Sequence, residues 1–129
     1  MNASGPESSR RALLLSLAAG VAAFASRGRR PAEAHHGWSG YDAAQTLTVT
    51  GTIQEASYGY PHGLMRLETP EKTWLVVLAP PSRLQRRGVT EDMLAVGATA
   101  TAEGYVSKRD PEEMRAERIT LAGKVFEMR

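Results

Sequence analysis

The chain has 129 residues, enough for one domain or for one domain and a targeting segment. It contains no cysteine, which excludes a disulfide framework, a thiolate metal site and a thiol nucleophile. The formal net charge is +2, but five of the 16 basic and two of the 14 acidic residues precede His35. The remaining 11 basic and 12 acidic residues lack the positive field that binding to a nucleic-acid backbone requires, so we expect no nucleic-acid partner.

An apolar run with a basic start predicts a cleavable export signal over residues 1–34. Arg10 and Arg11 precede an apolar stretch from Leu13 to Ala25. A charged start, a short apolar core and a small-x-small ending are the parts of a signal peptide. The run is shorter than the roughly 20 residues that span a bilayer, although an uncleaved anchor is the alternative. Ser-Arg-Arg-x-Leu-Leu, ending at Leu14, resembles the twin-arginine motif. It predicts that the protein is exported after folding, to the periplasm or outside the cell.

Two cleavage points satisfy the small-x-small rule. Cleavage after Ala25 would leave a basic stub ahead of the domain. Cleavage after Ala34 would make His35 the first residue of the mature protein, and this point lies directly before the sequence becomes domain-like. We therefore predict an export signal over residues 1–34 and one domain over residues 35–129, with no membrane span in the mature chain.

The mature region predicts an all-β fold. Five segments alternate apolar and polar residues or are rich in β-formers, and turn residues separate them. A short helix from Ser82 to Arg87, closed by Gly88, falls between the third and fourth segments. This order is typical of a small five-stranded OB-like barrel, and a small β-sandwich is the alternative. The predicted strands are Leu47–Gln54, Leu64–Glu68, Thr73–Leu78, Ala98–Val106 and Arg115–Leu121.

Several short motifs resemble a functionally uncharacterised family of small exported bacterial proteins. The domains of that family open with a His-His pair and carry a Pro-His dipeptide after the first strand. The resemblance implies export and an OB-like fold, and it implies no activity. The family usually has Asn before Pro-His, where this chain has Tyr60, so a role of that Asn side chain does not carry over. The matching pieces are Ala34–Gly37, Leu47–Ile53, Tyr60–His62, the strand with Trp74, Leu84–Thr90 and the strand that Gly97 opens.

The chain's three histidines predict a metal site. His35 and His36 precede the first strand, and His62 lies in the turn-rich segment that follows it. If the barrel closes, these two segments can lie side by side. Imidazole nitrogen suits copper or zinc, and copper binds such ligands more tightly. Cleavage after Ala34 would add the α-amino group of His35 as a ligand. The amine and ring of His35 together with a second histidine would form a histidine brace. Met65 is a further candidate, because its soft thioether suits Cu(I).

Three functions follow from this pattern. The first is a periplasmic copper-binding protein for delivery, storage or protection, with His35, His36 and His62 as ligands. The second is a small copper oxidase or oxygenase with the same ligands. The third is a metal-free OB-type module that binds an envelope protein or a small ligand through the aromatic segment from Tyr58 to His62. No catalytic residues are predicted, because no nucleophile–base spacing, phosphate loop or carboxylate pair is present.

Overall fold

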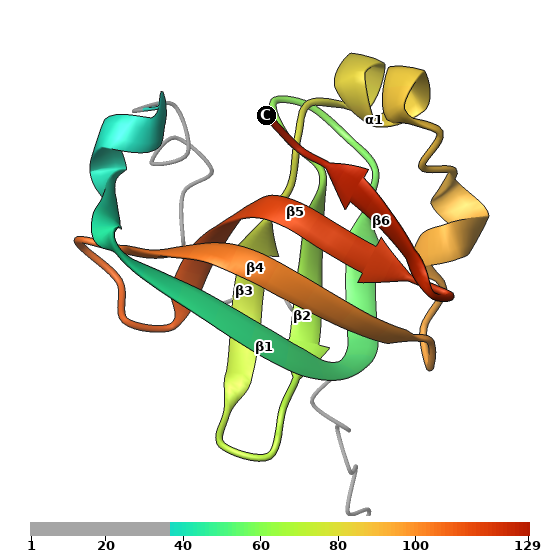
Figure 1. Cartoon of the computed structure of the whole chain (residues 1–129). Helices are drawn as coiled ribbons and strands as arrows, with labels where there is room; N and C mark the ends of the chain where they lie inside the picture. Colours follow the sequence, from blue (N-terminus) through green and yellow to red (C-terminus); the bar gives the residue numbers. More distant parts are fainter. Residues whose placement is uncertain (1–36) are drawn as a thin grey trace, which may run out of the picture.

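The computed structural model describes residues 37–129, and strands dominate this part of the chain. Figure 1 shows β1, β4 and β5 side by side across the front, with β2 and β3 behind them. Among the described residues, no helix is long and apolar enough to cross a membrane. The elements are β1 (Tyr41–Ser57), β2 (Leu64–Glu68), β3 (Thr73–Val77), α1 (Pro81–Arg87), a 3-10 helix η3 (Glu91–Leu94), β4 (Thr99–Ser107), β5 (Glu113–Leu121) and β6 (Lys124–Glu127).

The strands pair in the order β3-β2-β1-β4-β5-β6, and an additional β3–β5 pairing closes the first five into a ring. The β3–β5 pair is parallel and the other pairs are antiparallel. A closed ring leaves few unpaired edges, which is how barrel-like β-folds avoid edge-to-edge association. The predicted all-β, OB-like fold is thus confirmed, with the short helix α1 between β3 and β4.

The first strand is longer than predicted, and the structure has an additional strand at the C-terminal end. β1 begins at Tyr41, six residues before the predicted Leu47, and its pairing with β4 shifts register between Tyr41 and Thr46. This irregular stretch has no period-two pattern, so the sequence did not mark it as a strand. β6 adds a sixth strand that pairs with β5 after the turn at Gly123.

Gly51 allows β1 to serve two neighbours. The first half of β1 pairs with β4 and its second half pairs with β2. A Cβ atom at Gly51 would lie 2.0 Å from the backbone oxygen of Glu68. Only glycine permits the two backbones to approach so closely at this crossing.

The apolar side chains inside the ring form one contiguous core that is almost completely shielded from solvent. Alternate residues of every ring strand point inward, among them Ile53, Met65 and Met114, each at most 1% exposed. Leu84 of α1 and the C-terminal residues Phe126 and Met128 belong to the same core. α1 and the C-terminus thus lie together at one end of the ring, the upper end in Figure 1.

Candidate functional site

His62 is held on a fixed backbone. It follows the cis Tyr60–Pro61 peptide in the connection between β1 and β2 and is half-buried. The neighbouring Gly63 donates its N–H to Ala79 and accepts one from Leu78. These bonds anchor the loop against the end of β3, so the position of the imidazole is set by the ring of strands.

The imidazole of His62 contacts a buried arginine. Arg115 Nη2 lies 3.3 Å from His62 Nε2. Arg115 belongs to β5, where it pairs with Val77 on one side and Tyr105 on the other. It is only 6% exposed and is the one charged residue among the buried residues of the described part.

Trp38 covers the same arginine. Residues 37–40 form a turn of 3-10 helix directly before β1. The guanidinium carbon of Arg115 lies 4.2 Å from the centre of the Trp38 ring. Arg129 also lies over this ring, at 4.6 Å, and Tyr105 meets it edge-on with 6.0 Å between the ring centres. The segment before β1 and the loop after β1 therefore meet at Arg115.

The sequence-predicted ligands divide into described and undescribed residues. His35 and His36 lie outside the described residues, as do the export signal and both cleavage points. Met65 is a core residue with 1% exposure, pairing with Ala56 and Val76. Its thioether therefore packs in the core, and its role as a Cu(I) ligand stays a prediction. Residues 37–129 alone contain no group of three His, Cys, Asp or Glu side chains placed to hold a metal.

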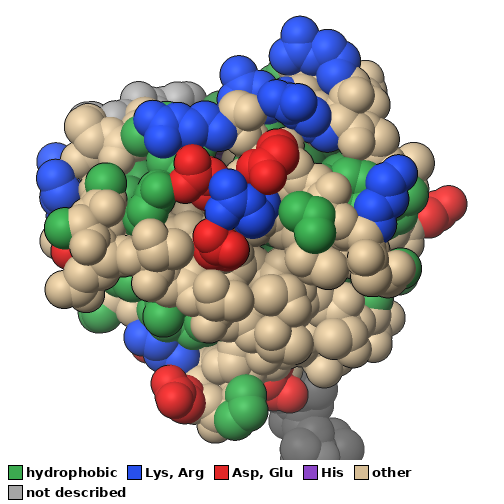
Figure 2. All heavy atoms as spheres, viewed as in Figure 1, with side chains coloured by type: hydrophobic (Ala, Val, Ile, Leu, Met, Phe, Trp, Pro, Cys, Tyr) green, Lys and Arg blue, Asp and Glu red, His purple; other side chains and the backbone are tan. Residues whose placement is uncertain are grey.

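The surroundings of Arg115 are strongly basic. Burial lowers the pKa of its guanidinium, the Tyr41 side chain opposes this, and Arg83 and Arg129 lower it further. Arg83 donates to the backbone oxygen of Met128, and Arg87 donates to that of Arg129. In Figure 2, Lys and Arg side chains gather along the upper edge of the molecule, where α1 and the C-terminus lie.

The aromatic residues near His62 have different roles. The Tyr58 hydroxyl donates to the backbone oxygen of Val89 at 2.7 Å, and burial raises the pKa of Tyr58, with a smaller effect from Glu91. Tyr41 donates to Glu113 Oε2 at 2.8 Å. These two side chains fix the ends of the ring, whereas Tyr60 is 78% exposed. Tyr60 is thus the aromatic side chain in the loop that a partner can contact.

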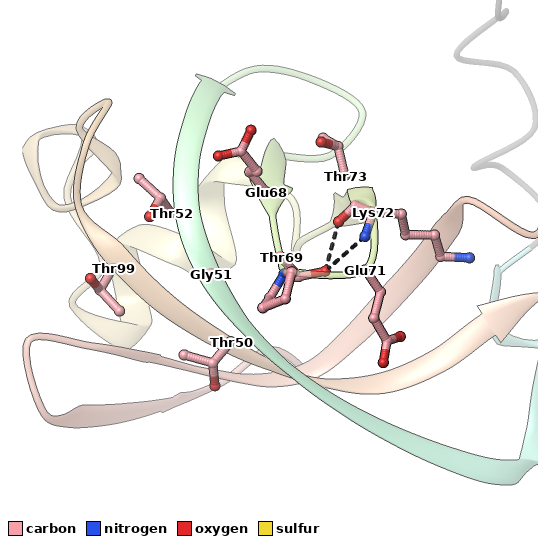
Figure 3. A pocket seen from close by; sticks show the side chains of 10 residues that line it. Thr50, Gly51, Thr52, Glu68, Thr69, Glu71, Lys72, Thr73 and Thr99 are labelled. Carbon is pink, nitrogen blue, oxygen red and sulfur yellow. Dashed lines mark hydrogen bonds between the residues drawn. The ribbon is translucent and has the colours of Figure 1, made fainter.

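A groove of about 690 Å³ lies away from Arg115, beside the turn between β2 and β3 and beside the middle of β1 (Figure 3). Threonine hydroxyls dominate its wall, and Thr69 Oγ1 bonds the backbone of Lys72 in the turn. Neither His62 nor Arg115 lines this groove. It is open and polar, and its Thr69 hydroxyl is bonded within the turn, so we assign it no chemistry.

Sequence reasoning did not identify Arg115 as a member of the site. In the sequence, Arg115 was only the expected first residue of a strand. The sequence shows only a basic residue between Met114 and Ala116 in a predicted strand. In a strand with one buried face, such a residue is expected on the opposite, polar face. Whether that face is covered depends on Trp38 and the C-terminus, which strand periodicity does not report.

A family model described as a family of unknown function (DUF6152) matches residues 23–115. The chain belongs to this family. The matched region includes His35, His36, His62 and Arg115. A comparison with curated proteins found no match.

Solved structures resemble the fold at low sequence identity. The chain is similar to the ZRD-deleted mutant of TiaS in complex with agmatine, with 16% identity and a TM-score of 0.50 over 67% of this chain and 27% of that one. It also resembles TiaS in a complex with a transfer RNA and ATP, with 14% identity and a TM-score of 0.48 over 63% of this chain and 19% of that one. The chain thus spans about a quarter or less of these proteins, and the likeness concerns the fold alone.

Proposed function

We propose that this protein is exported to the cell envelope and binds copper there through His35, His36 and His62, for delivery, storage or protection. One observation carries the proposal: Trp38 and His62 contact the same guanidinium, that of Arg115. His36 and His35 precede Trp38 by two and three residues, and each residue advances the chain by at most about 3.6 Å. This short spacing supports the proposal that both histidines bind the same metal as His62.

The available ligands suit copper. The three histidines supply nitrogen donors and the chain has no cysteine thiolate, and copper exceeds zinc in affinity for nitrogen donors. Cleavage after Ala34 adds the α-amino group of His35, which together with its own ring forms a chelate. Zinc is the second metal that this donor set accepts.

Copper and Arg115 compete for His62. A guanidinium only donates hydrogen bonds, so the contact with Arg115 uses the Nε2 lone pair of a neutral imidazole, and Nδ1 then carries the proton. A neutral imidazole has a single such lone pair. Copper binding at His62 must therefore open the Arg115 contact, which gives the proposal a specific signature.

The test is Cu(II) affinity by competition against a chelator, using protein that begins at His35. We expect one copper per chain, a loss of affinity of more than tenfold when Ala34 is retained, and a similar loss in His62→Ala. Tyr60→Ala, in the same loop, is the matched control and should bind copper as the unmodified protein does. Arg115→Gln should bind copper more tightly, because it releases the His62 lone pair and removes a positive charge.

Equal affinity with and without Ala34 would remove the amine from the ligand set. Unchanged affinity in His62→Ala would overturn the three-histidine site. Copper-dependent peroxide formation that disappears in His62→Ala would point to an oxidase, whereas a carrier only transfers metal.

A metal-free interaction module of the envelope is the second candidate. The 78% exposure of Tyr60 favours it, because tyrosine anchors many protein interfaces. Calorimetry that detects neither copper nor zinc binding by correctly processed protein, together with loss of an envelope partner in Tyr60→Ala, would establish this function in place of the first.

A further inference from the structure

Within the described part of the chain, Arg115 is a buried cation without a carboxylate beside it. Its polar contact there is the neutral imidazole of His62, and its aromatic contacts are Trp38 at 4.2 Å and Tyr41 at 5.9 Å. Arg83 and Arg129 are the charged groups that act on it, and both repel it. Across residues 37–129, no ion pair involves Arg115.

One guanidinium nitrogen lacks a hydrogen-bond partner among the described residues. Arg115 Nη1 is buried and makes no hydrogen bond to any of them, although it carries N–H donors. Burying a charge without a counter-charge is costly, and so is burying a donor without an acceptor. Stacking on Trp38 and the contact with His62 offset part of this cost. Neither supplies a negative charge or an acceptor for Nη1.

Two further arginines, Arg83 and Arg129, lie near Arg115. Arg129 lies on the same Trp38 ring, and Arg83 reaches the backbone oxygen of Met128 in the same C-terminal segment. Arg129 has an acidic neighbour in Glu117, with a 3.8 Å separation between Arg129 Nη1 and Glu117 Oε1. Glu117 also accepts the Tyr105 hydroxyl and keeps its negative charge, so it offsets one of the three arginines. Among residues 37–129, no ion pair involves Arg115 or Arg83, so their positive charge is left for a ligand to balance.

We propose that Arg115 is the centre of a binding site for a small oxyanion, with Nη1 donating to it and with Arg129 and Arg83 balancing its charge. An oxyanion brings both properties that the site lacks, a negative charge and oxygen lone pairs, and the guanidinium fork suits carboxylate and phosphate oxygens. The carboxylate of a small organic acid and inorganic phosphate share this chemistry. The site does not depend on copper, because its donors are the arginines and not the histidines.

The experiment uses the whole chain after chelator treatment, so that its result is independent of the proposed copper function. Acetate and inorganic phosphate are titrated separately at constant ionic strength, with chloride as the balancing anion. The readouts are the indole N–H resonance of Trp38, assigned with Trp38→Phe, and the thermal midpoint. We expect a saturable shift of the Trp38 resonance and a rise in the midpoint, since a ligand of the folded state stabilises it.

Matched variants locate the site. Arg115→Lys keeps the charge but loses the planar fork, and it should weaken binding about tenfold or more. Arg118→Lys, on the same strand but in exposed ion pairs, should leave binding unchanged. Arg129→Gln removes a partly exposed member of the basic cluster and should weaken binding several-fold, and it keeps the test valid if Arg115→Lys does not fold.

The two probes distinguish the sources of the ligand. A response to acetate identifies a carboxylate site, a response to phosphate alone identifies a phosphate site, and a response to both identifies a general oxyanion site. A wild-type response to both no larger than that to chloride would overturn the proposal. A response that survives unchanged in Arg129→Gln and in folded Arg115→Lys would also overturn it.

Discussion

Two arginines of β5 lie three residues apart and have opposite surroundings. The Arg118 side chain is 35% exposed and is bonded to two carboxylates, Glu103 at 2.5 Å and Glu127 at 3.1 Å, so its pKa is raised, first by the bond to Glu127. Arg115 is buried, has no carboxylate beside it among residues 37–129, and has a lowered pKa. Figure 2 shows acidic and basic side chains adjoining one another on the face of β4, β5 and β6. Within this part of the chain, the partly exposed cation is paired with carboxylates and the buried one is not. This contrast is the reason for placing a binding site at Arg115.

The two arginines share one face because of a bulge. Residues three apart in a regular strand point to opposite faces. Here Arg115 pairs with Tyr105 and Arg118 pairs with Glu103, which lie two residues apart on β4 and hence on the same face. The register shift between Glu103 and Gly104 adds one residue to β5 and produces this result. The difference between the arginines therefore comes from what covers that face.

The bulge depends on the close approach of two backbones at Gly104. A Cβ atom at Gly104 would lie 1.9 Å from the backbone oxygen of Arg115, and backbone atoms cannot move away without opening the β4–β5 pair. We expect Gly104→Ala to lower the free energy of unfolding by about 3 kcal/mol. Gly59→Ala, whose Cβ meets only a side-chain oxygen at 3.6 Å, is the control and should cost about 0.5 kcal/mol or less. Urea denaturation measures both, and equal stabilities would show that the close approach is absent.

The second test replaces the unpaired charge. Arg115→Met keeps an apolar stem against Trp38 and removes the buried cation. Because a buried charge without a partner destabilises the fold, we expect the free energy of unfolding to rise by about 1 kcal/mol in metal-free chloride buffer. A loss of about 3 kcal/mol or more would instead mean that a counter-charge is present. The measurement is again urea denaturation, repeated with acetate, which should stabilise only the unmodified protein.

The sequence was sufficient for the repeating parts of the structure and insufficient for its exceptions. Alternation in the Leu47–Gln54 segment and in the β2–β3 hairpin predicted strands, and the Ser82–Arg87 segment predicted a helix, because these elements follow local periodicity. α1 begins one residue earlier, at Pro81, with Pro80 as its N-cap. The bulge in β5 and the irregular start of β1 break that periodicity, so the sequence pattern did not predict them.

One part of the candidate site could be predicted from the sequence, namely the proximity of the two segments that flank the first strand. The prediction that the segments flanking the first strand could lie side by side followed from ring closure, and Trp38 and His62 now meet at Arg115. The burial of Arg115 could not be predicted, because it depends on Trp38 and Arg129 reaching the same point from opposite ends of the described chain. Such coverage is a property of tertiary packing.

Two tyrosines extend the comparison to the loop before β2. Tyr58 bonds the backbone oxygen of Val89, whereas Tyr60 is exposed. Tyr58→Phe should lower the free energy of unfolding by about 1 kcal/mol at neutral pH, through the lost hydrogen bond. The pKa of Tyr58 is raised above its usual value of 10.0, so its contribution is complete below pH 10 and is lost as the pH rises above 10. Tyr58→Phe should therefore lose stability less steeply than the unmodified protein above pH 10, and Tyr60→Phe should match the unmodified protein throughout.

The smallest effect belongs to Arg118. Its two ion pairs are in contact with water, where the attraction between the charges is weak and holding the side chains in place costs entropy. Arg118→Gln should therefore lower the thermal midpoint by about 3 °C or less. Salt screens exposed pairs, so the difference from the unmodified protein should shrink as sodium chloride is raised. For Arg115→Met we expect a difference of opposite sign that changes less with sodium chloride, because salt screens a buried charge less than an exposed one. A salt response of Arg115→Met equal to that of Arg118→Gln would mean that both arginines are solvated, and the contrast between them would then have no physical basis.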